Sequence, residues 1–376
     1  MTQPTRRGLL ATIGAGGLAG LAGCTDLLSG AQDFSDHPAN GLLEPGGVPF
    51  EEATREFMHE HDIPGGVLGV AVDGEIVVER GYGYRDEDLS QPMVPDTLVR
   101  IASLSKPLTR AAIRLLERRG EISFDDPVFG MLDLDPLPGD SYNERLDEIT
   151  IAHLLTHRGG WDRKQSDDPV FAQMDIALER GWDSLPDERR LVRHMLGEPL
   201  QFDPGEGHSY SNLGYIVLGL VVETVTGQPY QTFLEEAVLG PYGIEDIRIG
   251  RSLPADRPDR ETWYFDERTC PNVVELEPSE LVRCPDGGFH NESMAASGGH
   301  VLSIGAYLRF MTEYWLNGLP RGNDETHLQW SQDGALPGTS STALQRQGVD
   351  AVVVFNERGY DPNYSDIRSV LWDLIV

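Results

Sequence analysis

Residues 98–120 read LVRIASLSKPLTRAAIRLLERRG, an apolar run that leads into a predicted helix from Ser103 to about Arg119. Ser103 and Lys106 stand three residues apart at the start of this helix, so their side chains share one face and can meet. The helix N-terminus adds partial positive charge and N–H groups that stabilise negative charge beside Ser103. The segment therefore predicts that Ser103 is a nucleophile activated by Lys106. Burial and the helix dipole are expected to lower the pKa of Lys106.

A second motif lies in residues 207–215, which read GHSYSNLGY before an apolar helix predicted over 216–225. Tyr210 and Asn212 place a phenol and an amide on one short loop. A phenol near a lysine ammonium has a lowered pKa and can relay a proton to a leaving group. The alternative is a structural turn, in which Ser211 or Asn212 caps the helix and Tyr210 packs.

A third motif, residues 330–341, reads WSQDGALPGTSS and predicts a glycine-rich edge strand. Glycine at position 334 lets a substrate approach the backbone closely, where an N–H group can bind an oxyanion.

Together the three motifs resemble those of the serine beta-lactamase and penicillin-binding-protein-like hydrolases, most closely the class C and carboxylesterase-like branch. Ser103-x-x-Lys106, Tyr210-x-Asn212 and the Gly334 strand follow one another in the order of that family. Residues 151–161 and 296–299 also look like its recurring segments. The resemblance covers roughly residues 50–376.

The resemblance implies hydrolysis of an ester or amide through an acyl-enzyme on Ser103, with no cofactor. Lys106 and Tyr210 share the general-base work, and which of them takes the first proton stays open. Asn212 holds Lys106 and the substrate amide, and the backbone N–H groups of Ser103 and Ala335 form the oxyanion hole.

One position departs from the family pattern, because Gln332 stands where Lys or His usually begins the third motif. A neutral amide can donate a hydrogen bond to a substrate carboxylate but cannot form an ion pair with it. We therefore expect Gln332, Asp333, Gly334 and Ala335 to bind uncharged esters or amides better than anionic substrates, beta-lactams included.

Two readings of other classes compete with the hydrolase. The first is a non-catalytic ligand-binding or sensory lipoprotein that retains the fold, which Gln332 alone keeps open. The second is a metallohydrolase using His153 and His157, four residues apart on a predicted helix. The chain has no His-Glu-x-x-His motif, so we predict no metal site.

Predicted strands lie at both ends of the chain. Residues 67–72 and 76–80 form a hairpin through Asp73-Gly74, and strands over 338–345 and 351–356 precede a closing helix over 363–376. Between them, residues 125–291 are mostly helical. No regular βα alternation occurs, so we expect an α/β fold of the α+β type, with an antiparallel sheet built from both chain ends and a helical insertion.

The composition is strongly acidic, with 30 basic and 61 acidic residues and a formal net charge of −31. Such a surface repels phosphate backbones, so we expect no nucleic-acid partner. Molar salt shortens the Debye length to about 3 Å, so this charge favours a halophilic protein. Only Lys106 and Lys164 are lysine, which suggests that Lys106 is kept because it can lose its proton.

The N-terminus carries the signature of an exported lipoprotein. Arg6 and Arg7 precede an apolar stretch, residues 8–23, that is too short to span a membrane. Cys24 follows small residues as in a lipobox. We expect residues 1–23 to be a twin-arginine signal peptide, Cys24 to be lipidated outside the cytoplasmic membrane, and residues 24–49 to be a tether before the 50–376 domain.

Export exposes the remaining cysteines, Cys270 and Cys284, to an oxidising compartment. A disulfide between them is the favoured interpretation, and two buried free thiols are the alternative. The oligomeric state cannot be predicted.

Overall fold

The computed structural model describes residues 37–322, 328–346, 348–358 and 366–375. The expected signal peptide and Cys24 lie outside the described residues. Within these ranges, no helix combines the length and apolarity needed to cross a bilayer.

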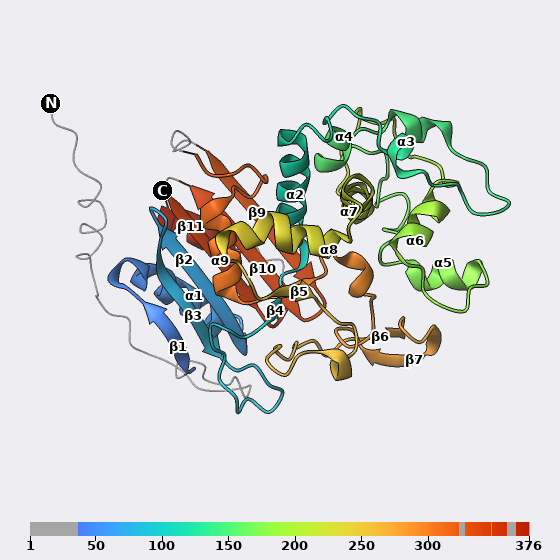
Figure 1. Cartoon of the computed structure of the whole chain (residues 1–376). Coiled ribbons are helices and arrows are strands. Elements are labelled where there is room, and N and C mark those ends of the chain that lie inside the picture. Colours follow the sequence, from blue (N-terminus) through green and yellow to red (C-terminus); the bar gives the residue numbers. More distant parts are fainter. Residues whose placement is uncertain (1–36, 323–327, 347, 359–365, 376) are drawn as a thin grey trace.

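A six-stranded antiparallel sheet forms one half of the molecule, in the order β1-β3-β2-β11-β10-β9 (Figure 1). At its centre the N-terminal β2 pairs with the C-terminal β11, with Val70 opposite Ala351. The sheet is therefore built from both chain ends, which confirms the expected fold class. The strands are β1 (Ala39–Leu43), β2 (Gly65–Val72), β3 (Glu75–Gly83), β9 (Gln329–Leu336), β10 (Thr339–Arg346) and β11 (Val349–Phe355).

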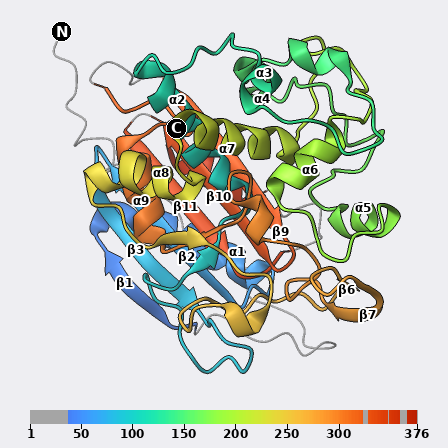
Figure 2. The ribbon, with the colours of Figure 1, turned by 45° about the vertical axis from the view of Figure 1, so that its right-hand side comes forward.

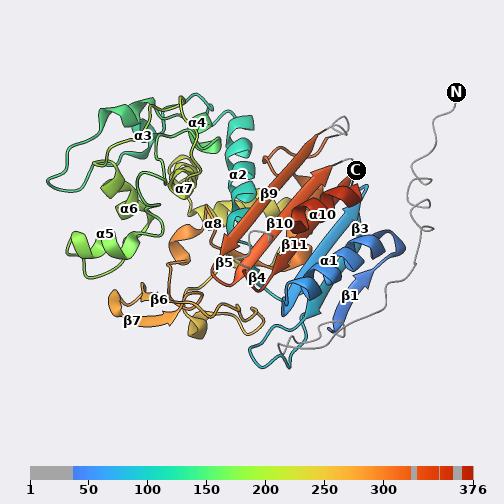
Figure 3. The same ribbon diagram turned by 180° about the vertical axis from the view of Figure 1, so that it is seen from behind.

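Helices cover both faces of this sheet because β2 and β11 are apolar on both sides. On one face α1 (Val48–Glu60) and α10 (Asp366–Ile375) pack through Phe57, Leu371 and neighbouring side chains (Figure 3). On the other face lie α9 (Ile304–Glu313) and α2 (Lys106–Arg118). The central strands β2 and β11 are thus covered on both faces, as their continuous apolar runs require.

The second half of the molecule is helical and lies beyond α2 and β9 (Figure 2). Its centre is α7, whose first eleven residues are all buried. The helices are α3 (Val128–Leu132), α4 (Ile151–Leu155), α5 (Gln173–Glu179), α6 (Glu188–Met195), α7 (Asn212–Thr226) and α8 (Tyr230–Phe233).

Two features differ from the sequence expectation. The tether expected to end at residue 49 is too long, because β1 pairs with β3 and α1 starts at Val48. Glycine at position 41 allows β1 to approach β3 this closely, since a Cβ there would lie 2.2 Å from Glu79 O. The expected insertion, residues 125–291, holds helices α3 to α8 but also three short strands, β5 (Ile247–Ile249), β6 (Thr269–Asn272) and β7 (Glu277–Arg283). Two further short strands, β4 (Val99–Arg100) and β8 (His300–Leu302), lie before and after it.

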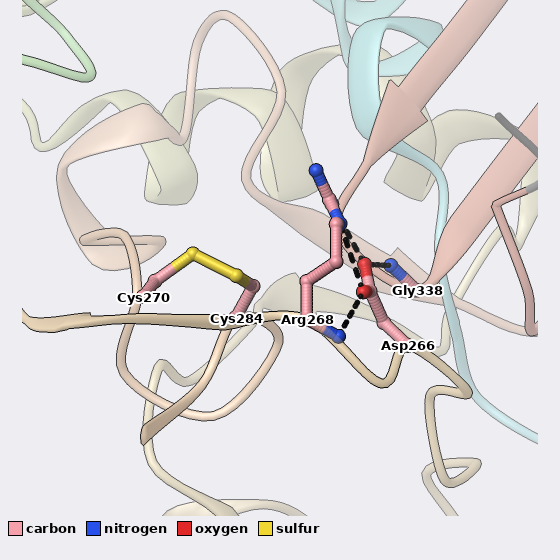
Figure 4. Close-up of a disulfide and its surroundings, with 5 residues drawn as sticks. All are labelled: Asp266, Arg268, Cys270, Cys284 and Gly338. Carbon is pink, nitrogen blue, oxygen red and sulfur yellow. Dashed lines mark hydrogen bonds and ion pairs between the residues drawn. A yellow bond between two sulfur atoms is a disulfide. The ribbon is translucent and has the colours of Figure 1, made fainter. Parts of the chain in front are cut away.

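In the structure Cys270 and Cys284 are joined by a disulfide with a Cα–Cα distance of 4.9 Å (Figure 4). The bond links β6 to the residue after β7. Closing a loop of this length contributes on the order of 3 kcal/mol in the chain-entropy model. Nearby, Asp266 accepts hydrogen bonds from Arg268 and from Gly338 N, which ties this hairpin to the turn between β9 and β10.

Candidate active site

Ser103 lies on a 3-10 turn, Ala102–Ser105, and α2 begins only at Lys106. The sequence had predicted one continuous helix from Ser103. Ala102 has a φ of +49°, an unfavourable conformation for a residue with a Cβ, and such strain is common beside reactive groups. Ser105 points away from the site, because it donates to Ala102 O at 2.8 Å and accepts from His300 N at 3.3 Å.

The three predicted catalytic side chains meet at one point. Ser103 Oγ lies 3.2 Å from Lys106 Nζ and accepts a hydrogen bond from Tyr210 Oη at 2.6 Å. Tyr210 arrives on the loop before α7, so residues more than one hundred positions apart converge on one hydroxyl. Lys106 Nζ also lies 4.7 Å from the Tyr210 ring centroid.

Lys106 is fully buried, and its amine has two further acceptors. Nζ donates to Asn212 Oδ1 at 2.7 Å and to Ser297 O at 2.6 Å. A neutral amine has two N–H groups and one lone pair, so these acceptors leave the lone pair for the Ser103 hydroxyl. Burial lowers the pKa of Lys106 well below its usual value, and the positive charge of Arg110 lowers it further. The amine can therefore accept a proton.

Asp168 belongs to this cluster, although sequence reasoning missed it. Its Oδ2 accepts from Asn212 Nδ2 at 2.8 Å, which turns Asn212 Oδ1 toward Lys106. Burial raises the pKa of the Asp168 carboxyl. No local signal marks this residue, since it stands in an acidic loop beside Asp167.

Tyr210 does not have the low pKa expected from a neighbouring cation. Burial raises its pKa to about 12, which outweighs the opposing effects of the hydrogen bond to Ser103 and of Arg110. The ring stacks on His157 with centroids 4.5 Å apart. Burial also lowers the pKa of His157 to about 3, so this neighbour is neutral.

A cavity of about 540 Å³ opens beside Ser103, and β9 forms one wall. Gly334 lies against the nucleophile turn, because a Cβ there would stand 2.6 Å from Ile101 O and 2.9 Å from Ser103 N. A larger residue would displace the turn, which explains the glycine. The residues from the three motifs that line the cavity are Ser103, Tyr210, Asn212, Ser331, Gln332, Asp333, Gly334, Ala335 and Leu336.

The cavity wall also carries positive charge that the sequence did not reveal. Arg163, Arg358 and Arg368 line it, and Arg368 donates to Asp333 Oδ2 at 2.7 Å. The argument from Gln332 alone against anionic substrates therefore does not hold. Asp333 also accepts from Thr342 Oγ1, so its carboxylate is held by the protein.

His153 and His157 do not share a helix as expected. His153 caps the start of α4, whereas His157 follows that helix with a φ of +57°. In the ranges that the structure describes, no three His, Cys, Asp or Glu side chains are grouped to hold a metal ion.

Comparison with known proteins identifies the family of the chain. The family model named Beta-lactamase matches residues 50–369. Esterase EstB of Burkholderia gladioli is 33% identical over 261 residues, 69% of this chain and 62% of the esterase. Penicillin-binding protein 4* of Bacillus subtilis is 32% identical over 237 residues, 61% of this chain and 48% of that protein. The chain thus spans less than two thirds of each relative.

Solved structures share the fold at lower identity. The octameric penicillin-binding protein homologue from Pyrococcus abyssi superposes with a TM-score of 0.64 at 21% identity, covering 87% of this chain and 77% of that one. D-amino acid amidase from Ochrobactrum anthropi SV3 gives a TM-score of 0.64 at 18% identity, covering 88% and 97%. Since the family model matches most of the chain and the fold agrees, the chain belongs to the beta-lactamase family of serine hydrolases.

Proposed function

We propose that the chain hydrolyses a small-molecule ester or amide through an acyl-enzyme on Ser103. The observation that carries the proposal is the position of Ser103 Oγ, 3.2 Å from Lys106 Nζ and 2.6 Å from Tyr210 Oη, at the wall of the cavity. The similarity to an esterase and to a penicillin-binding protein supports the same class of chemistry.

In the acylation step, Ser103 Oγ attacks the substrate carbonyl carbon and its proton passes to Lys106. The carbonyl electron pair moves to oxygen, which the backbone N–H groups of Ser103 and Ala335 bind. When the tetrahedral intermediate collapses, Tyr210 gives its proton to the leaving group, and Lys106 returns a proton to Tyr210. Water then attacks the acyl carbon and gives a proton to Lys106, the bond from Ser103 Oγ to the acyl carbon breaks to release the carboxylic acid, and Lys106 returns the proton to Ser103 Oγ.

The directions of the two pKa shifts support Lys106 as the first proton acceptor. Burial makes the Lys106 amine less basic and therefore available in its neutral form. Tyr210, with a pKa raised to about 12, stays protonated at neutral pH and suits the role of proton donor. In this proposal, Lys106 accepts the first proton and Tyr210 donates a proton to the leaving group.

A fluorophosphonate probe with intact-mass detection tests the nucleophile. We expect one adduct on the purified protein in multimolar salt, none on Ser103→Ala, and an undiminished adduct on Ser331→Ala, whose exposed side chain lines the same cavity. Low salt should reduce labelling, because self-repulsion at −31 then opposes the compact state. Folded protein without any adduct would contradict the proposal and favour a non-catalytic ligand-binding lipoprotein.

Asp168 offers a second test, because its hydrogen bond to Asn212 orients the amide oxygen that accepts from Lys106. Asp168→Ala removes the acceptor for Asn212 Nδ2, and we expect kcat to fall about tenfold to a hundredfold. Asp168→Asn keeps an acceptor oxygen and should lose less. Steady-state kinetics on a neutral ester measure both variants, and equal losses would show that this hydrogen bond does not orient Asn212.

We also propose export by the twin-arginine route and lipid attachment at Cys24. The signal-like residues 1–23 support this proposal, and a disulfide suits an oxidising compartment. Expressed in its own cells, the protein should fractionate with membranes, whereas Cys24→Ser should be released into the soluble fraction with unchanged esterase activity. Membrane retention of Cys24→Ser would contradict lipid attachment at this residue.

A further inference from the structure

Arg110 lies one helical turn after Lys106 on α2 and reaches all three motif-bearing elements. Its Nε donates to Tyr215 Oη on α7 at 2.6 Å. Its Nη1 donates to Leu316 O at 3.0 Å and to Gln332 Oε1 on β9 at 3.1 Å. In the part of the chain that the structure describes, no carboxylate forms an ion pair with Arg110, so neutral oxygens alone hold this partly buried guanidinium.

We propose that Arg110 is a positioning residue whose fixed positive charge, held by Gln332 and Tyr215, keeps Lys106 in its neutral, proton-accepting form. The inference rests on the proposed role of Lys106 as the proton acceptor. Arg110 does not line the cavity, so it acts on the substrate only through the groups that do.

Lys106 Nζ and the Arg110 guanidinium carbon lie 5.4 Å and 5.5 Å from the centroid of the same Tyr215 ring, so the two cationic groups are close enough to interact. Arg110 stands next after burial among the causes that lower the pKa of Lys106, and Arg163 adds a smaller effect of the same sign. Asp168 opposes both. Without Arg110, the carboxylate of Asp168 would offset more of the effect of burial, so the pKa of Lys106 would rise and less of the amine would be neutral at a given pH. The titratable and charged groups around Lys106 from all packed elements are Arg110, His157, Arg163, Asp168, Tyr210 and Tyr215.

Gln332 completes the arrangement. Its Oε1 accepts from Arg110 while its Nε2 donates to Asp333 O at 3.0 Å, so the amide has a fixed orientation. A lysine or a protonated histidine at this position would face the guanidinium and repel it. The neutral amide at 332 and the arginine at 110 therefore form a matched pair.

The scarcity of lysine allows a direct test by NMR. The full chain carries only Lys106 and Lys164, so isotope-labelled lysine gives two side-chain signals, and Lys164→Arg identifies that of Lys106. In Arg110→Gln we expect the Lys106 titration and the acid limb of kcat/KM to move upward together by about one pH unit. Arg114 lies one turn further along α2, and its Nε donates to Asn317 O. Arg114→Gln is therefore the control and should leave the Lys106 titration unchanged.

A charge-swapped variant separates electrostatics from packing. Arg110→Gln combined with Gln332→Arg moves the cation across the same hydrogen bond and should bring the Lys106 titration back toward that of the wild type. If Arg110→Gln does not fold, Arg110→Met retains the apolar stem and repeats the measurement. A Lys106 titration that stays at the wild-type position in a folded neutral variant overturns the inference. Because NMR needs no turnover, an inactive wild type would contradict the proposed hydrolysis and not this coupling.

Discussion

Lys106→Arg is expected to lower kcat/KM for a neutral ester by at least about a thousandfold, although it keeps the positive charge. Arginine cannot lose its proton in a protein, whereas a desolvated lysine can. Lys106 is fully buried, and two carbonyl oxygens occupy its N–H groups, so its lone pair is available to Ser103. The substitution removes this acceptor and leaves a bulky cation in its place.

Lys106→Ala should cause a loss of similar size, because the proton acceptor and not the charge is essential. Lys164→Arg is the matched control, since Lys164 is exposed, and its kcat/KM should equal that of the wild type. Steady-state kinetics at several pH values measure all three. If Lys106→Arg retained more than about a tenth of the activity, Lys106 would act as a cation and not as a base.

The sign of the pH dependence follows from the same group. The folded pKa of Lys106 is depressed, so the neutral amine predominates above that pKa. As pH falls through it, the amine becomes protonated and can no longer take the proton of Ser103. Activity is therefore expected to be lost on the acid side, in step with the Lys106 titration.

Residues close in sequence or on recognisable motifs were predictable. Ser103 and Lys106 share one helical turn, and the loop before α7 carries Tyr210 and Asn212 as a pair. The sheet was also predictable, since β2 and β11 are apolar runs and the turn residues Asp73-Gly74 join β2 to β3. Short-range patterns of this kind survive folding because local geometry alone determines them.

The partners that complete the site were not predictable, because loops bring them from elsewhere in the chain. Asp168 lies in an acidic loop, and the carbonyl of Ser297 bears no side-chain signature. The pKa of Tyr210 depends on burial, which exceeds the effect of nearby cations only in the folded protein. Likewise, Gln332 looks like a missing cation in the sequence, and only the fold brings Arg110 to it.

Tyr210→Phe is expected to lower kcat for alkyl esters and amides by about a hundredfold to a thousandfold, with little change in stability. The ring keeps its stacking on His157, and only the hydroxyl that donates to Ser103 Oγ is lost. Alkoxide and amine leaving groups need a proton as the bond to carbon breaks. Tyr210 is the phenol within reach of Ser103 and is protonated at neutral pH, so it can supply that proton.

The leaving group then distinguishes this role from simple positioning. An aryl ester releases a phenolate that needs little protonation, so Tyr210→Phe should lose only about tenfold on such a substrate. Comparing a series of esters with one acyl group and leaving groups of different pKa measures the effect, and Tyr242→Phe, an exposed tyrosine, is the control. The loss caused by Tyr210→Phe should grow steadily as the leaving group becomes more basic. An equal loss across the series would mean that Tyr210 only orients Ser103, and the leaving group would then take its proton from Lys106.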